Sequence, residues 1–241
     1  MESPFPMRIN KYLAEQGHAT RRGADELIAR GRVFINGKPA ELGSKVMEED
    51  IVEVKFGKRA KKQEYRYYAY NKPRGIITHS PKEGEEDVRD TLPQLADEGV
   101  FPVGRLDKDS HGLLIVTNDG RITDRLLNPE REHDKEYVVR TKAPLRKNFK
   151  ERMEAGVSIE GYVTKPARVR ITGDRSFTVT LTEGKKHQIR RMVVALWNEV
   201  DDLKRTRVMN IKLGNIKAGQ ARPIEGEELD EFLVLLGLKQ A

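Results

Sequence analysis

The sequence predicts an α+β protein made of a small N-terminal domain and a larger second domain. A chain of 241 residues is long for one ordinary domain and short for three. Strand-like runs follow one another closely from Val100 onward, without the alternation of strand and helix that is typical of a doubly wound parallel sheet. We therefore expect an N-terminal domain over residues 1–57, a linker over 58–64, and a second domain over 65–241 built on a mixed, mainly antiparallel sheet.

The composition favours a polyanionic partner and a reducing environment. Lys and Arg number 45 against 38 Asp and Glu, which gives a formal net charge of +7, and such an excess attracts nucleic acid. The chain has no cysteine, which excludes disulfides, thiol nucleophiles and metal–thiolate sites. No apolar stretch approaches the roughly 20 residues of a membrane span, and the N-terminus lacks the pattern of a secretory signal. We expect a cytoplasmic protein without membrane association.

The N-terminal domain is predicted to contain two short helices and a few short strands. Apolar side chains recur at helical spacing over residues 8–16 and again over 21–30. A strand-like run at 33–35 then meets Asn36-Gly37, a pair that favours a tight hairpin turn. Basic residues lie on or beside both helices, among them Arg8, Lys11, Arg21 and Arg22.

These cations have two interpretations. Lys and Arg are common on any helix surface, so a solvated helix face accounts for them. The pattern R-I-N-K-Y-L-A … R-R-x-A-D-x-L-I-x-x-G-R-V-x-I-N-G-K, however, resembles the S4 RNA-binding domain over residues 7–54. The resemblance implies that the two helices present Arg8, Lys11, Arg21 and Arg22 to a folded RNA backbone.

The linker prediction depends on a change in composition. Residues 57–63 carry four cations and no apolar periodicity, so this stretch is expected to join the domains and to be able to touch phosphates. In the second domain the first predicted strand covers residues 65–70 and resumes at 76–78 after a turn. The later predicted strands are residues 101–103, 113–117, 135–141, 167–171, 177–181 and 209–213. The predicted helices are residues 123–127, 145–155, 187–197 and 227–236.

One loop of the second domain carries residues that are typical of a reactive site. Gly104 and Gly112 bracket a tight turn that contains Arg105 and Asp107 and runs directly into the predicted strand 113–117. Rigid scaffolds hold functional groups at such positions. On the residues alone, Asp107 is equally explained as a turn former or helix cap.

The longer pattern around this loop carries a family resemblance. The sequence G-R-L-D-x-D-S-x-G-L-L-I-V-T-N-D-G at residues 104–120 resembles the catalytic motif of RNA pseudouridine synthases, specifically the RsuA family, which pairs an S4 domain with the catalytic domain. The resemblance extends over residues 65–236 and is strongest to the type that acts on large-subunit (23S) ribosomal RNA. Ser110 stands where that motif usually has Thr. The resemblance implies that Asp107 is catalytic and that Arg105 contacts RNA by entering the place of a flipped nucleotide.

A tyrosine in a predicted strand is the second candidate. Tyr137 alternates with apolar neighbours, and most such tyrosines serve in packing. The match of K-E-Y-x-V to the family implies instead that Tyr137 is an active-site residue. Its ring would stack beside the target base, and its hydroxyl would take part in proton transfer.

The third candidate is the segment of residues 183–192. Apolar residues at helical spacing from Ile189 onward predict a helix, with Arg190 at the edge of the buried face, where an arginine is usually solvated. The match to G-[KR]-x-H-Q-I-R-R-M implies that Arg190 pairs with Asp107. Because no carboxylate is spaced beside His187, we expect it to contact RNA rather than act as a base. The expected RNA contacts of this segment are Lys185, His187 and Arg191.

The resemblance implies that the chain isomerises a uridine of RNA to pseudouridine, with neither a cofactor nor a metal ion. The expected substrate is ribosomal RNA of the large subunit, and small-subunit (16S) RNA or a tRNA are alternatives. A different class of function is a non-catalytic RNA-binding or ribosome-assembly protein that has kept the fold. We expect the protein to act as a monomer.

Overall fold

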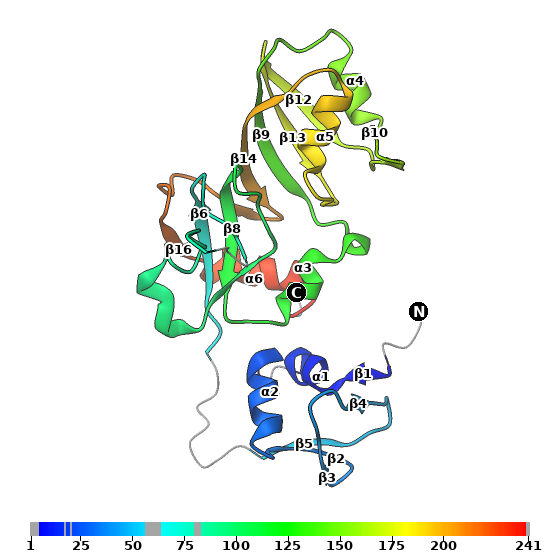
Figure 1. Cartoon of the computed structure of the whole chain (residues 1–241), viewed down its shortest axis with the longest axis vertical. Helices are drawn as coiled ribbons and strands as arrows, with labels where there is room; N and C mark the ends of the chain where they lie inside the picture. Colours follow the sequence, from blue (N-terminus) through cyan, green and yellow to red (C-terminus); the bar gives the residue numbers. More distant parts are fainter. Residues whose placement is uncertain (1–4, 17, 20, 56–63, 80–82, 240–241) are drawn as a thin grey trace. The chain divides into compact units, whose positions relative to one another are not determined.

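The computed structural model describes residues 5–16, 18–19, 21–55, 64–79 and 83–239 (Figure 1). The chain forms two compact units, one of Met1–Arg66 with Thr117–Thr123 and one of Tyr67–Val116 with Asp124–Ala241. The predicted linker lies outside the described residues except for Glu64. Within the described part of the chain, no helix is long and apolar enough to cross a membrane.

The smaller unit places two helices on short antiparallel strands. The helices are α1 (Ile9–Glu15) and α2 (Arg21–Ala29), and the strands are β1 (Met7–Arg8), β2 (Val33–Ile35), β3 (Lys38–Pro39), β4 (Lys45–Val46) and β5 (Val52–Val54). The predicted hairpin is confirmed, because β2 pairs with β3 across Asn36 and Gly37, both at positive φ. Ile9, Leu13 and Val33 form part of the fully buried core of this unit.

The larger unit is built on a nine-stranded sheet, with the order β12-β13-β9-β14-β8-β6-β16, β15 beside β14 and β7 beside β8. The strands are β6 (Tyr67–Lys72), β7 (Phe101–Val103), β8 (His111–Thr117), β9 (Lys135–Thr141), β12 (Arg168–Gly173), β13 (Ser176–Leu181), β14 (Val200–Val208), β15 (Ile211–Lys212) and β16 (Ala221–Pro223). The β14–β8 pairing is parallel, whereas β14 and β13 both pair with β9 in antiparallel register. The predicted α+β class with a mixed, mainly antiparallel sheet is confirmed.

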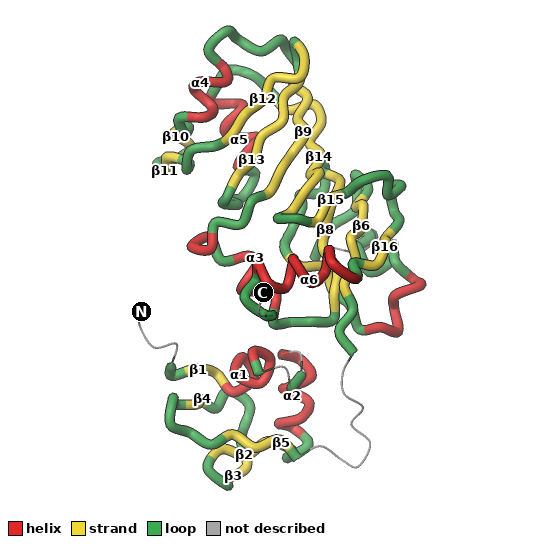
Figure 2. The backbone as a smooth tube through the Cα atoms, turned by 180° about the vertical axis from the view of Figure 1, so that it is seen from behind, coloured by secondary structure: helices red, strands yellow, loops and turns green. Residues whose placement is uncertain are grey.

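Helices cover one face of the sheet where β9, β12 and β13 run side by side. The helices of the larger unit are α3 (Ile122–Leu127), α4 (Phe149–Glu154), α5 (Gln188–Ala195) and α6 (Gly226–Leu235), and a two-stranded ribbon joins β10 (Ser158–Ile159) to β11 (Tyr162–Val163). Helices α4 and α5 lie beside β12 and β13 (Figures 1 and 2). Phe177 and Val179, on the same face of β13, belong to one core cluster with Phe149 of α4 and Met192 of α5. This core fixes the start of α5 against the sheet.

The central strand β14 is the longest element that the sequence patterns missed. Its nine residues read V-D-D-L-K-R-T-R-V, so only Val200, Leu203 and Val208 are apolar. Burial alternates poorly along it, and polar side chains at Asp202 and Arg205 engage neighbouring elements instead of solvent. A period-2 search for apolar residues therefore finds no strand here, although β14 lies between β9 and β8 (Figure 1).

Candidate active site

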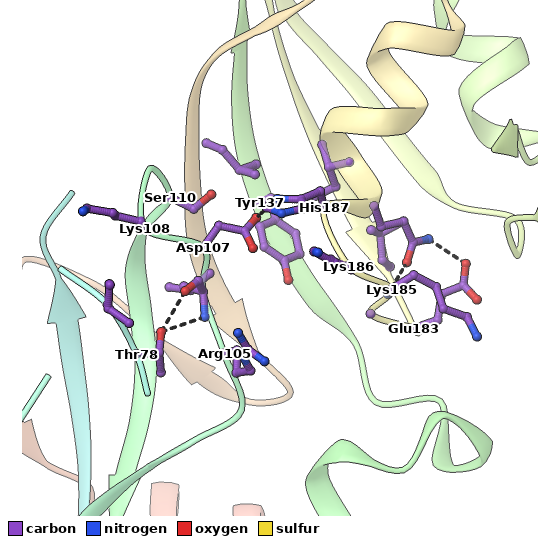
Figure 3. A pocket seen from close by; sticks show the side chains of 17 residues that line it. Thr78, Arg105, Asp107, Lys108, Ser110, Tyr137, Glu183, Lys185, Lys186 and His187 are labelled. Carbon is purple, nitrogen blue, oxygen red and sulfur yellow. Dashed lines mark hydrogen bonds and ion pairs between the residues drawn. The ribbon is translucent and has the colours of Figure 1, made fainter. Parts of the chain in front are cut away.

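A cavity of about 610 Å³ opens in the larger unit where three segments meet (Figure 3). The loop of Arg105 to Ser110 forms one wall, β9 contributes Tyr137, and the residues from Glu183 to Ile189 at the start of α5 form another wall. The volume falls within the range of about 300–1,000 Å³ that is typical of small-molecule sites. The cavity therefore has room for a nucleotide.

The backbone on either side of Asp107 is held by hydrogen bonds. The Thr78 hydroxyl donates to the Leu106 carbonyl at 2.7 Å and accepts from the Leu106 amide at 3.1 Å. The Ser110 amide donates to the Asp107 carbonyl at 3.0 Å, which closes a turn directly after the aspartate. Asp107 thus projects from a loop whose conformation is fixed before any ligand binds.

Two buried cationic side chains donate hydrogen bonds to backbone carbonyls of the same loop from the interior of the protein. The Lys72 ammonium, fully buried at the end of β6, donates to the carbonyls of Ser110 at 2.9 Å and Pro73 at 2.8 Å. Burial lowers the pKa of Lys72 from 10.5 to about 8, and the nearby carboxylate of Asp107 opposes that shift. Arg205 of β14, also buried, donates from Nη1 to the Arg105 carbonyl of the loop at 3.4 Å and from Nε to the Leu113 carbonyl of β8 at 2.7 Å.

Gly112 allows β8 and β14 to approach each other closely at the end of this loop. Its φ is +101°, and a Cβ atom built on it would lie 2.3 Å from the Arg205 carbonyl oxygen. No L side chain fits that position without displacing the backbone of β14. The glycine that closes the predicted loop therefore sets the distance between the loop and the central strand.

The side chains of Asp107 and His187 point toward each other in the lining of the cavity (Figure 3). Its Oδ2 lies 3.1 Å from Nδ1 of His187, with 33% of the Asp107 side chain and 45% of the His187 side chain exposed. His187 precedes α5 in a left-handed conformation (φ 51°), which directs its ring toward the loop. The expectation that no carboxylate lies beside His187 is wrong, because the fold brings Asp107 there from 80 residues away.

The expected pair between Arg190 and Asp107 is not formed among the described residues. Arg190 instead donates from Nη2 to the Ser110 hydroxyl at 3.2 Å and to the Asp109 carbonyl at 3.3 Å. It therefore reaches the predicted loop but contacts it two and three residues beyond Asp107. The physical reason is local: His187 lies about one helical turn earlier and occupies the carboxylate, while Arg190 extends to the next stretch of backbone.

Tyr137 lies in the same cavity as Asp107 (Figure 3). It occupies the middle of β9, paired in register with Val179 of β13 and Arg205 of β14, and is half-buried against the core of this half of the sheet. Within the described residues, its hydroxyl has no hydrogen-bond partner. The structure thus brings two of the three predicted catalytic side chains to one cavity, and the third, Arg190 of α5, contacts the loop that carries the first.

Comparison with known proteins identifies both units. A model of the S4 domain matches residues 7–52, and a model described as RNA pseudouridylate synthase matches residues 66–195. The chain belongs to the RNA pseudouridylate synthase family. The predicted combination of an S4 domain with a pseudouridine synthase domain is confirmed, and the chain is an enzyme that isomerises uridine in RNA.

Several relatives match the synthase over most of their length. It is 39% identical to the dual-specificity RNA pseudouridine synthase RluF of Escherichia coli K12, over 95% of this chain and 79% of the relative. It is 35% identical to the ribosomal large subunit pseudouridine synthase B of Bacillus subtilis, over 95% and 96% of the two chains. A crystal structure of a pseudouridylate synthase superimposes with a TM-score of 0.69 at 27% identity, covering 95% of this chain and 99% of the other.

The predicted RNA contacts of the synthase fall into two groups. Arg105, Lys185 and His187 line the cavity, whereas Arg191 does not and pairs with Glu160 at 2.7 Å. The other predicted contacts belong to the smaller unit: Arg8 and Arg21 are exposed, Lys11 is half-buried and lies 3.6 Å from Glu15, and the side chain of Arg22 lies outside the described residues.

Glu183 is a site residue that the sequence analysis did not single out. Its side chain is only 3% exposed and accepts hydrogen bonds from the Gln188 side chain at 2.6 Å, the Lys165 amide at 3.0 Å and the Tyr162 hydroxyl. These bonds shape the turn that carries Lys185 and His187. The Glu183-to-Gln188 spacing was visible in the sequence, but a buried carboxylate cannot be distinguished there from an exposed one.

Among the described residues, no group of three or more His, Asp or Glu side chains is arranged to hold a metal ion. The polar groups of the cavity include instead the two carboxylates of Asp107 and Glu183, a phenol, an imidazole and several cations. Such a set provides an anion beside proton-transfer groups, surrounded by positive charge that attracts phosphates.

Proposed function

We propose that this synthase converts a uridine of large-subunit ribosomal RNA to pseudouridine, with Asp107 as the group that acts at the sugar. The observation that carries the proposal is the placement of Asp107 on a fixed loop, inside a nucleotide-sized cavity shared with Tyr137. The large-subunit assignment is supported by the relative from Bacillus subtilis, whose name gives the ribosomal large subunit, at 35% identity over almost the full length of both chains.

The reaction exchanges one bond for another without gaining or losing atoms. The bond from uracil N1 to the sugar C1′ breaks, the uracil turns, C5 bonds to C1′, and the proton on C5 leaves while N1 ends protonated. The Asp107 carboxylate serves this exchange either by attacking C1′ or by removing a sugar proton to give a glycal intermediate. Both routes need the carboxylate oriented toward the sugar, which the Thr78 and Ser110 hydrogen bonds provide.

Tyr137 is suited to handle the base. Its ring forms a wall of the cavity and its hydroxyl has no partner among the described residues, so the hydroxyl is available to a bound uracil. We assign the ring to stacking beside the flipped base and the hydroxyl to transfer of the C5 proton.

Arg190 and the basic side chains of the rim have supporting roles. Arg190 fixes the Asp107 loop through the Ser110 hydroxyl and the Asp109 carbonyl, which makes it a positioning residue. Arg105, Lys185 and His187 line the cavity with positive or protonatable groups, which fits the phosphates that flank an everted nucleotide. We further propose that the synthase acts as a monomer and that it acts in the cytoplasm, where its proposed ribosomal substrate is found.

The name of the Escherichia coli relative, which states dual specificity, favours a second RNA substrate as well. We infer that a tRNA is the second substrate class. This candidate is separate from the large-subunit assignment and is tested in the same experiment.

The test uses unmodified transcripts of 23S RNA, 16S RNA and a tRNA pool, each labelled with tritium at uridine C5. The proposal predicts tritium release by the wild type from 23S RNA, and release from the tRNA pool would support the second substrate. Release from 16S RNA alone would contradict the large-subunit assignment. A failure to release tritium from any of the three would favour a protein that only binds RNA.

A further inference from the structure

The single tryptophan of the chain occupies an exposed and strained position. Trp197 follows α5 and is 70% exposed. Its φ is 65°, and its amide donates to the Val194 carbonyl at 2.9 Å, while the Asn198 amide donates to the Val193 carbonyl at 3.1 Å. This pair of bonds defines the helix C-terminal motif in which glycine is the usual residue at the left-handed position. A large aromatic side chain there is both strained and solvated, and such outliers cluster at functional sites.

The indole of Trp197 lies near the guanidinium of a neighbouring loop. The Arg146 guanidinium lies 5.8 Å from the centre of the Trp197 ring. The loop that carries Arg146 is fastened to the end of α5, because Asn198 donates from its side chain to the Ala143 carbonyl at 2.9 Å and accepts from the Ala143 amide at 3.2 Å. The indole and the guanidinium are therefore preorganised relative to each other in the free protein.

This exposed pair lies at the far end of the helix that begins in the active-site cavity. Gln188 and Ile189, the first residues of α5, line the cavity. An eight-residue helix is about 12 Å long, which corresponds to roughly three or four nucleotides of a stacked strand at about 3.4 Å each. Val194, 59% exposed, lies one turn before Trp197, and Arg190 and Arg191 lie one turn earlier still.

We propose that Trp197 and Arg146 form a base-stacking subsite for an unpaired nucleotide that flanks the target uridine. An exposed indole binds any base by stacking, and an adjacent guanidinium strengthens that stack. RNA is favoured over a protein partner because the loop beside the indole carries Arg146 and Lys147, neither of which has an acidic partner among the described residues, and because the cavity proposed to take the target uridine lies at the other end of α5. The subsite rests on the proposed RNA substrate and adds a second point of contact to it.

The lone tryptophan allows a direct test, since its fluorescence reports on this position only. Unmodified 23S RNA transcript is titrated into the full-length wild type, and we expect the indole emission to be quenched as the RNA binds. The same transcript, labelled at uridine C5, gives kcat and KM by tritium release.

Two substitutions distinguish stacking from a structural role. Trp197→Gly places the preferred residue at this backbone position and is expected to unfold at no lower temperature than the wild type. It should raise KM by about 5- to 100-fold, the range expected for one lost base stack, with kcat within about twofold. Trp197→Phe keeps an aromatic ring and should retain KM within about threefold.

The results that overturn the subsite differ from those that overturn the ribosomal assignment. Tritium release together with unchanged emission on RNA binding, or a Trp197→Gly variant with wild-type KM, rejects the subsite alone. A fall in the kcat of Trp197→Gly without a change in its KM also rejects the subsite, because the substitution would then affect the reaction in the cavity and not the binding of RNA. Self-association that Trp197→Gly abolishes would assign the surface to a second copy instead. Quenching by RNA without tritium release would reject the ribosomal assignment while leaving the stacking site in place.

Discussion

The two segments that meet in the cavity are held in different ways. The Asp107 loop rests on buried groups, because the Lys72 ammonium and the Thr78 hydroxyl bind its backbone from the protein interior. The segment that precedes α5 is held by two buried polar side chains, Glu183 and Gln188, but its own Lys185 and His187 side chains are exposed. The difference fits the two roles proposed above: a carboxylate that acts at the sugar must be aimed before substrate arrives, whereas exposed cations that attract phosphate act through water and need little fixing of their side chains.

Of the substitutions that test how the Asp107 loop is held, removal of the Lys72 ammonium should have the largest effect on stability and kcat. Lys72→Met leaves the Ser110 and Pro73 carbonyls without their buried donor, so we expect a loss of about 2 kcal/mol in the free energy of unfolding and a kcat at least about tenfold lower. Urea unfolding and tritium release measure the two effects. The control is Lys108→Met, an exposed lysine of the same loop, which should change the free energy of unfolding by less than about 0.5 kcal/mol. Equal effects of the two substitutions would mean that the loop does not depend on the buried cation.

The lowered pKa of Lys72 predicts a pH dependence of stability. The pKa is about 8 in the folded chain against 10.5 for an ordinary lysine, so above pH 8 the folded protein releases a proton that the unfolded chain still holds. The unfolded state then binds more protons, and the Lys72 contribution to the free energy of unfolding rises with pH between about 8 and 10.5. From pH 8 to pH 9.5 we expect the wild type to gain about 1–2 kcal/mol relative to Lys72→Met.

The comparison with Lys72→Met is needed because burial also lowers the pKa of Lys135 to about 8, and both proteins retain that lysine. Parallel pH curves for the two proteins would mean that Lys72 has an ordinary pKa in the folded chain.

Arg190 connects the two segments, because it belongs to α5 and donates hydrogen bonds to the Asp107 loop. Arg190→Ala should lower kcat by about tenfold with KM within about twofold, because the lost hydrogen bonds position the loop and do not hold RNA. Arg191→Ala removes the neighbouring guanidinium, which lies outside the cavity and pairs with Glu160, and should leave kcat unchanged. Comparable losses of kcat and affinity in Arg190→Ala would indicate an ordinary phosphate contact.

The smallest effect is expected for a single exposed cation of the rim. Lys185→Ala should weaken RNA binding by a few-fold, reduce the slope of log affinity against log salt by about 1, and leave kcat at saturation intact. Filter binding at several salt concentrations checks this, with Lys150→Ala as the control, because Lys150 lies on α4 and pairs with Glu154. A salt slope identical to that of the wild type would remove Lys185 from the RNA interface.

The sequence predicted correctly those elements whose formation depends on residues that are close together in the chain. The strand predicted at 135–141 matches β9 (Lys135–Thr141), because its centre is a run of β-branched and aromatic residues, Tyr137-Val138-Val139. The helix predicted at 145–155 begins only at Phe149, since the preceding loop is fastened to Asn198 rather than coiled. The strand β14 was missed because its partners for Asp202 and Arg205 lie on distant segments.

The candidate site was predicted only in part, because some of its contacts join residues that are far apart in the chain. Asp107 and Tyr137 belong to recognisable motifs and lie in one cavity. The contact between Asp107 and His187 joins residues 80 positions apart, and the support from Lys72 depends on backbone carbonyls that no sequence pattern marks. Buried charges that bind the backbone of another segment become visible only once the chain is folded.

The measurement that tests the account most directly compares two aspartates of the same loop. Asp107 faces the cavity, whereas Asp109 is exposed and contributes its backbone carbonyl, not its carboxylate, to the contact with Arg190. Under single-turnover conditions on C5-tritiated 23S RNA, Asp107→Asn should lose at least about 10³-fold in rate while keeping its affinity for RNA, and Asp109→Asn should remain within about threefold of the wild type. Near-wild-type tritium release by Asp107→Asn, or an equal loss in both variants, would contradict a catalytic role for Asp107.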